Sequence, residues 1–372
     1  MKRIGNVYYK ICSYENLVNA HMRARQGKGH YRQVREVDEH MEEYLKNLEF
    51  LLTNEIYYIN SFDYKKEIIV DKGKEREIMK LAYYPHRVVQ WAIMLQIQDR
   101  FLKSFILDTY ASIPERGIHF GVKRVKKILK ENPEECKYCL KLDMKKYYPS
   151  INNRILFEIV RTKIKDTKLL RLVKIIIFSA GEKGQPIGSL WSQWAGNLYL
   201  SIIDHYAKEV LKPTSYNRLC DDIVLFGSSK EELRASFNQI KKIANEKLDL
   251  KIKENYQIFP TCIRGVDFLG YRFFGRYTLL RKRVKRAMIR KLSKLKDKKV
   301  LTARENSQIN SYKGWLMYCD SYRLHSKYLK PLHGKIYFVD GKTKRVNVYK
   351  KKRRKNVYNR QREKTNSNYK WC

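Results

Sequence analysis

Hydrophobic and polar positions in the middle of the chain follow two different periods. Residues 138–144, with the sequence YCLKLDM, alternate apolar and polar side chains, as a half-buried strand does. Further on, an apolar side chain recurs at every fourth position, at Trp194, Leu198, Ile202, Tyr206 and Val210. This spacing places the apolar residues on one face of a helix, so the pattern predicts a strand followed by a helix of several turns.

Two adjacent aspartates interrupt an apolar run in residues 215–227, SYNRLCDDIVLFG. Burying carboxylates that have no partner is costly. The segment therefore predicts two short strands, with the turn at or beside Asp221 and Asp222. An Asp doublet is also ordinary turn chemistry, so the pair alone does not establish a catalytic site.

A second helix and a further strand are predicted after the aspartate pair. Ser229 followed by Glu232 has the spacing of a capping box, which marks the start of a helix. One face of this helix carries Leu233, Phe237, Ile240 and Ala244. Residues 248–255, LDLKIKEN, then alternate again as a strand.

The order of these elements predicts an α+β fold. Strand, helix, strand, strand, helix, strand is the order of the ferredoxin-like split βαβ arrangement. In that arrangement, the strand end that carries Asp143 lies beside the hairpin that carries Asp221 and Asp222. We therefore expect three carboxylates to converge.

Composition and charge indicate a partner with many negative charges. The 372 residues include 79 Lys and Arg against 38 Asp and Glu, a formal net charge of +41, and 43% are hydrophobic, enough for real cores. Nucleic acid and anionic membrane would both fit this charge. No apolar run approaches the about 18 residues of a spanning helix, and the N-terminus lacks a signal-peptide core, which favours a nucleic-acid protein without a membrane partner.

The seven cysteines are scattered and predict reduced thiols in the cytoplasm. Cys136 and Cys139 form a single CxxC without a second pair or a nearby His cluster, which argues against zinc. From Lys342 onward the chain is almost entirely basic and polar. We expect this stretch to be a flexible arm that contacts phosphates, although a tail that only aids solubility would look the same.

Clustered carboxylates are tolerated when a cation lies between them. With hard oxygen ligands and no His or Cys nearby, the expected ion is Mg²⁺, with Mn²⁺ as a substitute. Two such ions can hold the attacking and leaving oxygens of a phosphoryl transfer. Together with the basic surface, this predicts nucleotide addition.

Six motifs resemble those of reverse transcriptases. The segments LKLDMKKYYPSI, GQPIGSLWSQWAGNLYL, LCDDIVLF and GVDFLGYRFF are similar to the palm motifs, and EREIMKLAYYPHRVVQWAIM and DTYASIPERGIHFGVKRVKK to the fingers motifs of the bacterial branch. The resemblance covers about residues 1–330. Within PIGSLWSQ, Ile187 precedes the glycine and Gln193 follows Ser192, a pattern similar to the reverse transcriptases of diversity-generating retroelements rather than to retron or group II intron enzymes.

The resemblance implies a right-hand polymerase. The expected divisions are an N-terminal extension and fingers over 1–135, a palm over 136–275 with fingers elements at about 150–192, a helical thumb over 276–335 and a basic tail over 336–372. Asp143 and Asp221 would ligate both metals, Asp222 would complete the carboxylate set, and the backbone carbonyl of Met144 would be a further ligand.

The resemblance also implies residues that bind the incoming dNTP. Tyr148 would lie beneath the sugar, where its ring excludes a ribose 2′-hydroxyl, unless it is simply a core tyrosine. Arg76, assisted by Lys74, would bind the triphosphate, because a guanidinium matches phosphate oxygens in a bidentate fork. Ile187 and Gly188 would lie against the nascent base pair. Ile187 replaces a Gln of the family, so we expect low fidelity, especially opposite template adenine, although a neutral packing change is the alternative.

The template and primer would be bound by Ser192, Gln193 and the predicted thumb. Residues 276–296, RYTLLRKRVKRAMIRKLSKLK, place Leu279, Leu280, Val284, Met288 and Leu292 on one side of a helix. The cations assigned to the nucleic-acid backbone are Arg281, Lys282, Arg283, Lys285 and Arg286. A solvated helix without this role is the alternative.

The match has four departures. Leu219 replaces a family Tyr that contacts primer or template, Cys220 follows it, Asn255 stands where many relatives carry a Lys near the active site, and His86 replaces an Asp. The expected activity is error-prone synthesis of cDNA from a template-repeat RNA, in a bacterial or phage-infected cell. The expected partners are template RNA, the cDNA product, their RNA–DNA hybrid, dNTPs and a small basic helical accessory protein. The alternatives are a retron-like or phage-defence reverse transcriptase and a non-catalytic RNA-binding protein.

Overall fold

The computed structural model describes residues 2–71, 73–339 and 341–349. The chain forms two compact units, with the boundary between Thr278 and Leu279. This boundary lies close to residue 276, where the thumb was expected to begin. The finer divisions at residues 135 and 335 stay predictions. Among the described helices, none has both the length and the apolarity to cross a membrane.

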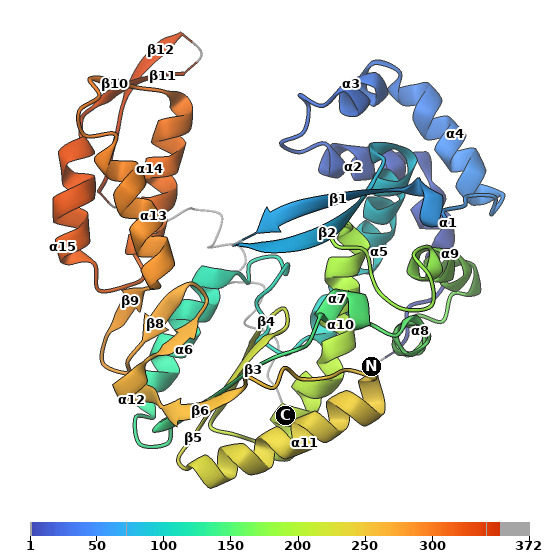
Figure 1. Cartoon of the computed structure of the whole chain (residues 1–372). Helices are drawn as coiled ribbons and strands as arrows, with labels where there is room; N and C mark the ends of the chain where they lie inside the picture. Colours follow the sequence, from blue (N-terminus) through green and yellow to red (C-terminus); the bar gives the residue numbers. More distant parts are fainter. Residues whose placement is uncertain (1, 72, 340, 350–372) are drawn as a thin grey trace, which may run out of the picture. The chain divides into compact units, whose positions relative to one another are not determined.

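The first unit is built around a four-stranded antiparallel sheet. Its strands are β3 (Tyr138–Asp143), β4 (Ser215–Leu219), β5 (Asp222–Gly227) and β6 (Gln257–Pro260). They lie in the order β4-β5-β3-β6, and helices α10 (Leu190–Tyr206) and α11 (Lys230–Leu248) belong to the connections from β3 to β4 and from β5 to β6 (Figure 1). This is the strand order of the split βαβ arrangement, and the expected α+β class is confirmed.

The fourth strand lies later in the chain than predicted. Residues 248–255 alternate in polarity, but only Ile252 makes a β-bridge, to Met144, whereas β6 pairs with β3 from Tyr138 to Lys141. The reason is that β3 ends at Asp143, so the segment around Ile252 passes the end of that strand and finds little backbone to pair with. Alternation of side chains reports burial of one face, not the presence of a neighbouring strand.

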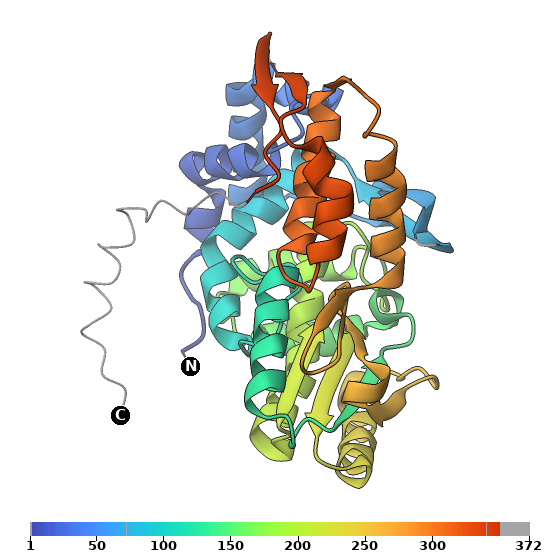
Figure 2. The ribbon, with the colours of Figure 1, turned by 90° about the vertical axis from the view of Figure 1, so that its left-hand side faces the viewer.

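The two faces of the sheet are covered by different helices. Leu140, Leu142, Ile223 and Leu225 pack into the main core together with apolar residues of α10 and α11. Helix α11 begins as predicted at Ser229, whose hydroxyl accepts from Glu232 N at 3.1 Å, although the Glu232 carboxylate accepts from Ser228 N rather than closing a full capping box. On the other face, helix α6 (Ile118–Glu131) contacts β4 (Figure 2).

The rest of the first unit is mainly helical. The elements before β3, besides α6, are α1 (Tyr8–Cys12), α2 (Tyr14–Ala24), α3 (Arg32–Glu39), α4 (Met41–Thr53), η1 (Ser61–Asp63), β1 (Tyr64–Asp71), β2 (Lys74–Leu81), η2 (Tyr83–Arg87) and α5 (Val88–Ser104). Strands β1 and β2 form an antiparallel hairpin. The later elements are α7 (Tyr147–Ser150), α8 (Asn153–Arg161), α9 (Thr167–Phe178), η3 (Ala207–Leu211), α12 (Thr261–Arg264), β7 (Val266–Phe268) and β8 (Tyr271–Phe273).

The second unit combines helices with a small sheet. Strand β9 (Thr278–Leu280) spans the boundary, and the elements that follow are α13 (Lys282–Ser293), β10 (Val300–Leu301), α14 (Ala303–Leu316), α15 (Tyr322–Leu324), η4 (His325–Leu329), η5 (Lys330–Leu332), β11 (Ile336–Val339) and β12 (Lys342–Arg345). The predicted apolar side of α13 is present at Met288 and Leu292, which are buried. Leu279 and Leu280 instead belong to β9.

The prediction of a flexible arm is wrong for its first part. Strand β12 pairs antiparallel with β11, and Val346 and Val348 are both only 1% exposed. These two valines are the apolar residues in an otherwise basic stretch, and burying them ties the segment to the second unit. The remainder of the predicted arm, residues 350–372, lies outside the described residues.

Candidate active site

Strand β3 and the β4–β5 turn bring the predicted carboxylates to one end of the sheet. Asp143, the last residue of β3, lies opposite Asp222, the first residue of β5. Leu219 pairs with Asp222, so Cys220 and Asp221 form a two-residue turn, as the sequence predicted. Cys220 has a φ of +58°, a conformation that residues other than glycine seldom adopt. Strain of this kind costs about 1–3 kcal/mol and persists where the surrounding structure fixes it.

Asp221 lies in an unfavourable electrostatic environment. Burial, and next the negative charge of the neighbouring Asp143 carboxylate, raise the pKa of Asp221 to about 6. Two carboxylates that face each other disfavour each other's ionised form. The pair formed by Asp143 and Asp221 would therefore gain from a positive charge beside it.

Lys253 supplies one such charge and was missed by the sequence analysis. Its Nζ lies 2.7 Å from Asp143 Oδ2, and both side chains are about one third exposed. Asn255, which was identified as a departure from the family Lys, is exposed. A lysine does lie beside the carboxylates in this chain, but it is Lys253, two residues before Asn255. The Ile252–Met144 bridge, which sets Lys253 beside Asp143, gives no separate signal in the sequence.

Asp222 has a different partner from the other two aspartates. Its carboxylate lies 3.4 Å from Nζ of Lys141, a β3 residue on the same face of the sheet. Among the described residues, no three His, Cys, Asp or Glu side chains are close enough together to hold a metal ion. All three carboxylates lie at one end of the sheet, with Asp143 and Asp221 as the interacting pair, and the part of Asp222 in metal binding stays a prediction.

The groups around this pair nevertheless suit a divalent cation. Asp143 Oδ1 is buried and accepts no hydrogen bond from the residues that the structure describes. The Met144–Ile252 bridge is made by the residues on either side of Met144, through Lys253 N to Asp143 O and Lys145 N to Lys251 O. The carbonyl of Met144 itself therefore points away from Ile252. Two carboxylates and a carbonyl are oxygen ligands of the kind that Mg²⁺ takes, with water and substrate phosphates filling its other positions.

Tyr148, in α7, lies directly beside the turn. Its hydroxyl is 3.7 Å from Cys220 Sγ, and its ring lies so close to Gly196 of α10 that a methyl group there would come within 3.1 Å of it. The adjacent Tyr147 is instead buried and donates to the Gly196 carbonyl at 2.5 Å. Of the two tyrosines, Tyr148 is thus the one beside Asp221 and Cys220, and it is only partly buried.

The segment with Ile187 and Gly188 is tied to the β1–β2 hairpin. Met79 N on β2 donates to the Ile187 carbonyl at 3.2 Å. Ile187 is half-buried, and Gly188 is exposed with a φ of +109°, which only glycine adopts readily. Arg76, on the same strand β2, is exposed, and Lys74 begins that strand. One backbone hydrogen bond therefore joins the strand of the predicted triphosphate ligands to the predicted base-pair contact.

Ser192 and Gln193 lie in the first turn of α10, but only one of them is accessible. The Ser192 side chain is buried, 1% exposed, so the expected direct contact with template or primer is not supported at this position. The helical phase explains this, because Ser192 lies between the buried Trp191 and the exposed Gln193 and points into the core. Gln193 stays a predicted contact.

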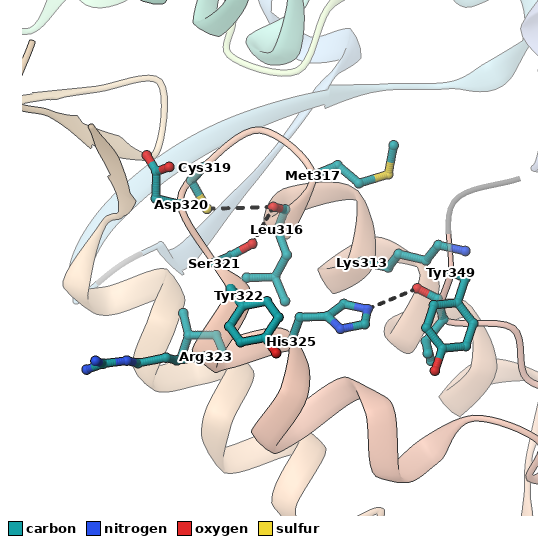
Figure 3. Close-up of a pocket in the computed structure, with 12 residues that line it drawn as sticks. Lys313, Leu316, Met317, Cys319, Asp320, Ser321, Tyr322, Arg323, His325 and Tyr349 are labelled. Atoms are coloured by element: carbon teal, nitrogen blue, oxygen red, sulfur yellow. Dashed lines mark hydrogen bonds between the residues drawn. The ribbon is translucent and has the colours of Figure 1, made fainter. Parts of the chain in front are cut away.

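The predicted thumb cations belong to the second unit. Lys282, Arg283, Lys285 and Arg286 are exposed on α13, and Arg281 is the half-buried residue before it. Their binding to the nucleic-acid backbone stays a prediction. This unit also contains a cavity of about 680 Å³ at the end of α14, lined by Leu316, Tyr322, His325 and Tyr349 among others, and no predicted site residue lies there (Figure 3).

Three other residues that the sequence singled out have structural surroundings. His86 is buried and shares a hydrogen bond of 2.9 Å with the Tyr57 hydroxyl, and burial lowers the pKa of its imidazole. Cys136 and Cys139 are buried, and burial raises the pKa of Cys136 to about 12. The expectation that this CxxC does not bind zinc stays a prediction.

Comparison with known proteins points to one family. A family model described as "Reverse transcriptase (RNA-dependent DNA polymerase)" matches residues 64–273, more than half of the chain. Protein YkfC of Escherichia coli K12 is 23% identical over 255 residues, which cover 57% of this chain and 65% of that protein.

Similar solved structures include two telomerases. That of Candida tropicalis without ligand has 15% identity and a TM-score of 0.43, and covers 58% of this chain and 47% of its own. That of Candida albicans in complex with a TWJ fragment of telomeric RNA has 12% identity and a TM-score of 0.44, and covers 62% of this chain and 50% of its own. The chain thus spans less than two thirds of the length of each of these proteins.

Proposed function

The chain belongs to the reverse transcriptase (RNA-dependent DNA polymerase) family, and from this premise we propose that it synthesises error-prone cDNA on the template-repeat RNA of a diversity-generating retroelement. The observation that carries the proposal of an active polymerase is the pair formed by Asp143 and Asp221 at the end of the sheet. Burial and mutual repulsion raise the pKa of Asp221 to about 6, and Asp143 keeps a buried oxygen without a hydrogen-bond donor among the described residues. A pair that is costly to the fold in this way suits a catalytic role.

In the proposed mechanism, Asp143, Asp221 and the Met144 carbonyl would hold Mg²⁺. When bound, the ions polarise phosphate oxygens and neutralise charge that develops during phosphoryl transfer. Lys253, whose Nζ lies 2.7 Å from Asp143 Oδ2, balances the charge of that carboxylate when no ion is bound. Asp222, held by Lys141, has a supporting role in this scheme.

The nucleotide is bound and selected by residues around the carboxylates. Arg76 on the β1–β2 hairpin binds the triphosphate, and Lys74 assists. Tyr148 packs on Gly196 beside the turn. In the proposed scheme its ring lies beneath the sugar and excludes a ribose 2′-hydroxyl, so the enzyme selects dNTPs. Gln193 and the cations of α13 contact the template and primer backbones without reading sequence.

The role in a diversity-generating retroelement is supported by position 187. Ile187 is half-buried in a segment fixed by Met79, and its apolar side chain makes no hydrogen bond to a base. Loss of a polar contact at such a site relaxes selectivity. The template RNA, the accessory protein and the cytoplasmic setting belong to this proposal.

The activity is tested by extension of a primer on RNA with Mg²⁺ and dNTPs. The wild type should extend, and Asp221→Ala should lower the rate by about 100-fold or more. Asp222→Ala should cost less, because its partner is Lys141. Asp99→Ala, at an exposed aspartate of α5, is the matched control and should leave the rate unchanged. A wild type that does not extend, or an Asp221→Ala variant as active as Asp99→Ala, would favour a non-catalytic RNA-binding protein.

The retroelement class is tested by sequencing the cDNA. Ile187→Gln should reduce substitutions opposite template adenines, and Ile187→Val, which keeps an apolar side chain, should not. Equal spectra for the wild type and Ile187→Gln would contradict the role of this residue. A template and variable repeat pair beside the gene, differing mainly at adenines, would separate this class from retron-like enzymes.

A further inference from the structure

Arg218 is a fully buried cation three residues before Asp221. It lies in β4, and its partner Asp204 on α10 is also fully buried. The two form a bidentate pair, with Nε donating to Oδ1 at 2.7 Å and Nη2 to Oδ2 at 2.6 Å. Such fork-to-fork geometry fixes the plane of the guanidinium as well as its position.

The other three N–H groups of Arg218 also have acceptors. Two donate to the side-chain and backbone oxygens of Asn197 on α10, at 3.2 and 3.3 Å. The last, on Nη1, donates to the Cys220 carbonyl at 2.9 Å. All five donors of the guanidinium are therefore used. Four of them anchor the group to α10, and the fifth reaches the turn that carries Asp221.

The backbone of Arg218 is held from the opposite side. Its N–H donates to the Asp108 carbonyl at 2.9 Å, and its carbonyl accepts from Tyr110 N at 3.0 Å. Strand β4 is thus fixed along its outer edge at the residue that bears the guanidinium. The backbone from which the Arg218 side chain reaches the Cys220 carbonyl is therefore held in place.

The Cys220 carbonyl and the Asp221 N–H belong to one peptide plane, so fixing the carbonyl orients the start of Asp221. The same residue, Cys220, has the strained φ of +58°. We propose that Arg218 is a positioning residue, which holds the Cys220–Asp221 peptide so that the Asp221 carboxylate faces Asp143. The role assigned to Asp221 rests on the proposed function, whereas the contact of Arg218 with the turn does not.

The opposing explanation is that Arg218 only stabilises the core. The two explanations differ in what Arg218→Lys does. A lysine keeps the charge beside Asp204, but its compact ammonium has three donors and no planar fork. It therefore does not span Asp204, Asn197 and the Cys220 carbonyl together.

The matched control is Tyr216→Phe. The Tyr216 hydroxyl donates to Asp204 Oδ1 at 2.7 Å, so its removal weakens the same buried carboxylate without touching the turn. A second test variant, Asn197→Ala, frees Nη1 of Arg218 and keeps the pair with Asp204, and it serves if Arg218→Lys does not fold. For each protein we would measure urea unfolding, Mn²⁺ binding by EPR without nucleotide, and the half-saturating Mg²⁺ in primer extension.

Arg218→Lys should weaken Mn²⁺ binding and raise the half-saturating Mg²⁺ by about 10- to 100-fold, the usual effect of losing a group that orients a metal ligand. Asn197→Ala should shift both in the same direction by a smaller factor. Tyr216→Phe should lower stability and leave both values within about twofold of the wild type, because it loses one hydrogen bond outside the turn.

Equal metal affinity in Arg218→Lys and Tyr216→Phe, or changes that only follow the loss of stability, would overturn the proposal. A wild type that binds Mn²⁺ but does not polymerise would refute the proposed function alone. In that case the comparison of Mn²⁺ affinities would still decide the role of Arg218.

Discussion

Two aspartates in the first unit, Asp204 and Asp221, are surrounded in opposite ways. The Asp204 carboxylate is fully buried and accepts from both sides of the Arg218 fork, from the Tyr216 hydroxyl and from Thr109 Oγ1. Asp221 faces another carboxylate, which contributes to the rise of its pKa to about 6. The same unit therefore satisfies a fully buried carboxylate completely at Asp204, on helix α10. The excess of negative charge at Asp221, which Lys253 offsets only in part, is a local property of the turn, as expected where a cation or a substrate completes the site.

The largest change in stability should come from removing the charge of Asp204, the aspartate whose hydrogen bonds are all satisfied. Asp204→Asn leaves the Arg218 charge buried without its counter-ion, so the free energy of unfolding should fall by about 3–5 kcal/mol. Urea denaturation measures the loss. Asp99→Asn, at an exposed position of α5, is the control and should change stability little. A loss below about 1 kcal/mol would mean that the pair is not a stabilising one in this setting.

Removing the charge of Asp221 should instead increase the stability of the protein. In EDTA at pH 8, Asp221→Asn should raise the free energy of unfolding by about 1–3 kcal/mol, because it removes a carboxylate whose ionised form is disfavoured in the folded state. The same variant should lose cDNA synthesis. Chemical denaturation and primer extension on one preparation would test both effects.

The pH dependence of that gain provides its control. The pKa of Asp221 is raised from 3.8 to about 6 on folding, so the folded state binds the extra proton and the contribution to stability is present below about pH 4. It is lost as pH rises through about 6. The advantage of Asp221→Asn should therefore be large at pH 8 and small at pH 4. An advantage independent of pH would point to packing instead of charge.

The two lysines near the aspartates should differ in their effect on metal binding. Lys253→Met removes a cation that competes for Asp143, so Mn²⁺ affinity should rise by about threefold to tenfold, as expected for one charge at short range near the surface. Lys141→Met should have a smaller effect, since Lys141 pairs with Asp222. Titration by EPR measures both, with Lys253→Arg as the variant that keeps the charge. An equal effect of the two lysines would show that Asp222 belongs to the metal site after all.

The smallest effect on stability should come from the buried imidazole of His86. His86 has the Tyr57 hydroxyl at 2.9 Å, and burial lowers the pKa of its imidazole. The folded protein keeps His86 neutral while the unfolded chain takes up a proton below about pH 6.5, so stability is lost as pH falls from 7 to 5, by about 1 kcal/mol. Urea unfolding of the wild type and His86→Gln across this range should give a shallower pH slope for the variant. Identical slopes would contradict a buried neutral imidazole.

The elements that could be predicted from the sequence are those that depend on residues close to one another in the chain. Strand β3, the turn at Asp221 and helices α10 and α11 follow from alternation, a four-residue period and a helix cap, and these signals act within a few residues. The fourth strand was misplaced because the alternation over residues 248–255 reflects one buried face, while pairing depends on how far β3 extends. The burial of Ser192 likewise depends on the phase of α10, which residue identity does not specify.

The electrostatic partners were the least predictable part of the site. Lys253 and Lys141 are two of 79 cationic residues, and nothing in their neighbourhood distinguishes them from those facing solvent. Arg218 was not singled out either, although an Arg between Tyr216 and Leu219 in a predicted strand could have suggested a buried partner. Residue type indicates what a carboxylate needs, but only the fold shows which cation reaches it.

The hydrogen bond from Met79 to Ile187 has a mechanical consequence. If the β1–β2 hairpin shifts as one piece when a triphosphate binds, the hydrogen bond from Met79 N would also shift the loop that carries Ile187, the residue predicted to contact the base pair. Binding of the triphosphate at the hairpin and placement of Ile187 against the base pair would then depend on the same movement. Substitutions in the β1–β2 hairpin would therefore change the error rate of cDNA synthesis without altering a residue at the base pair.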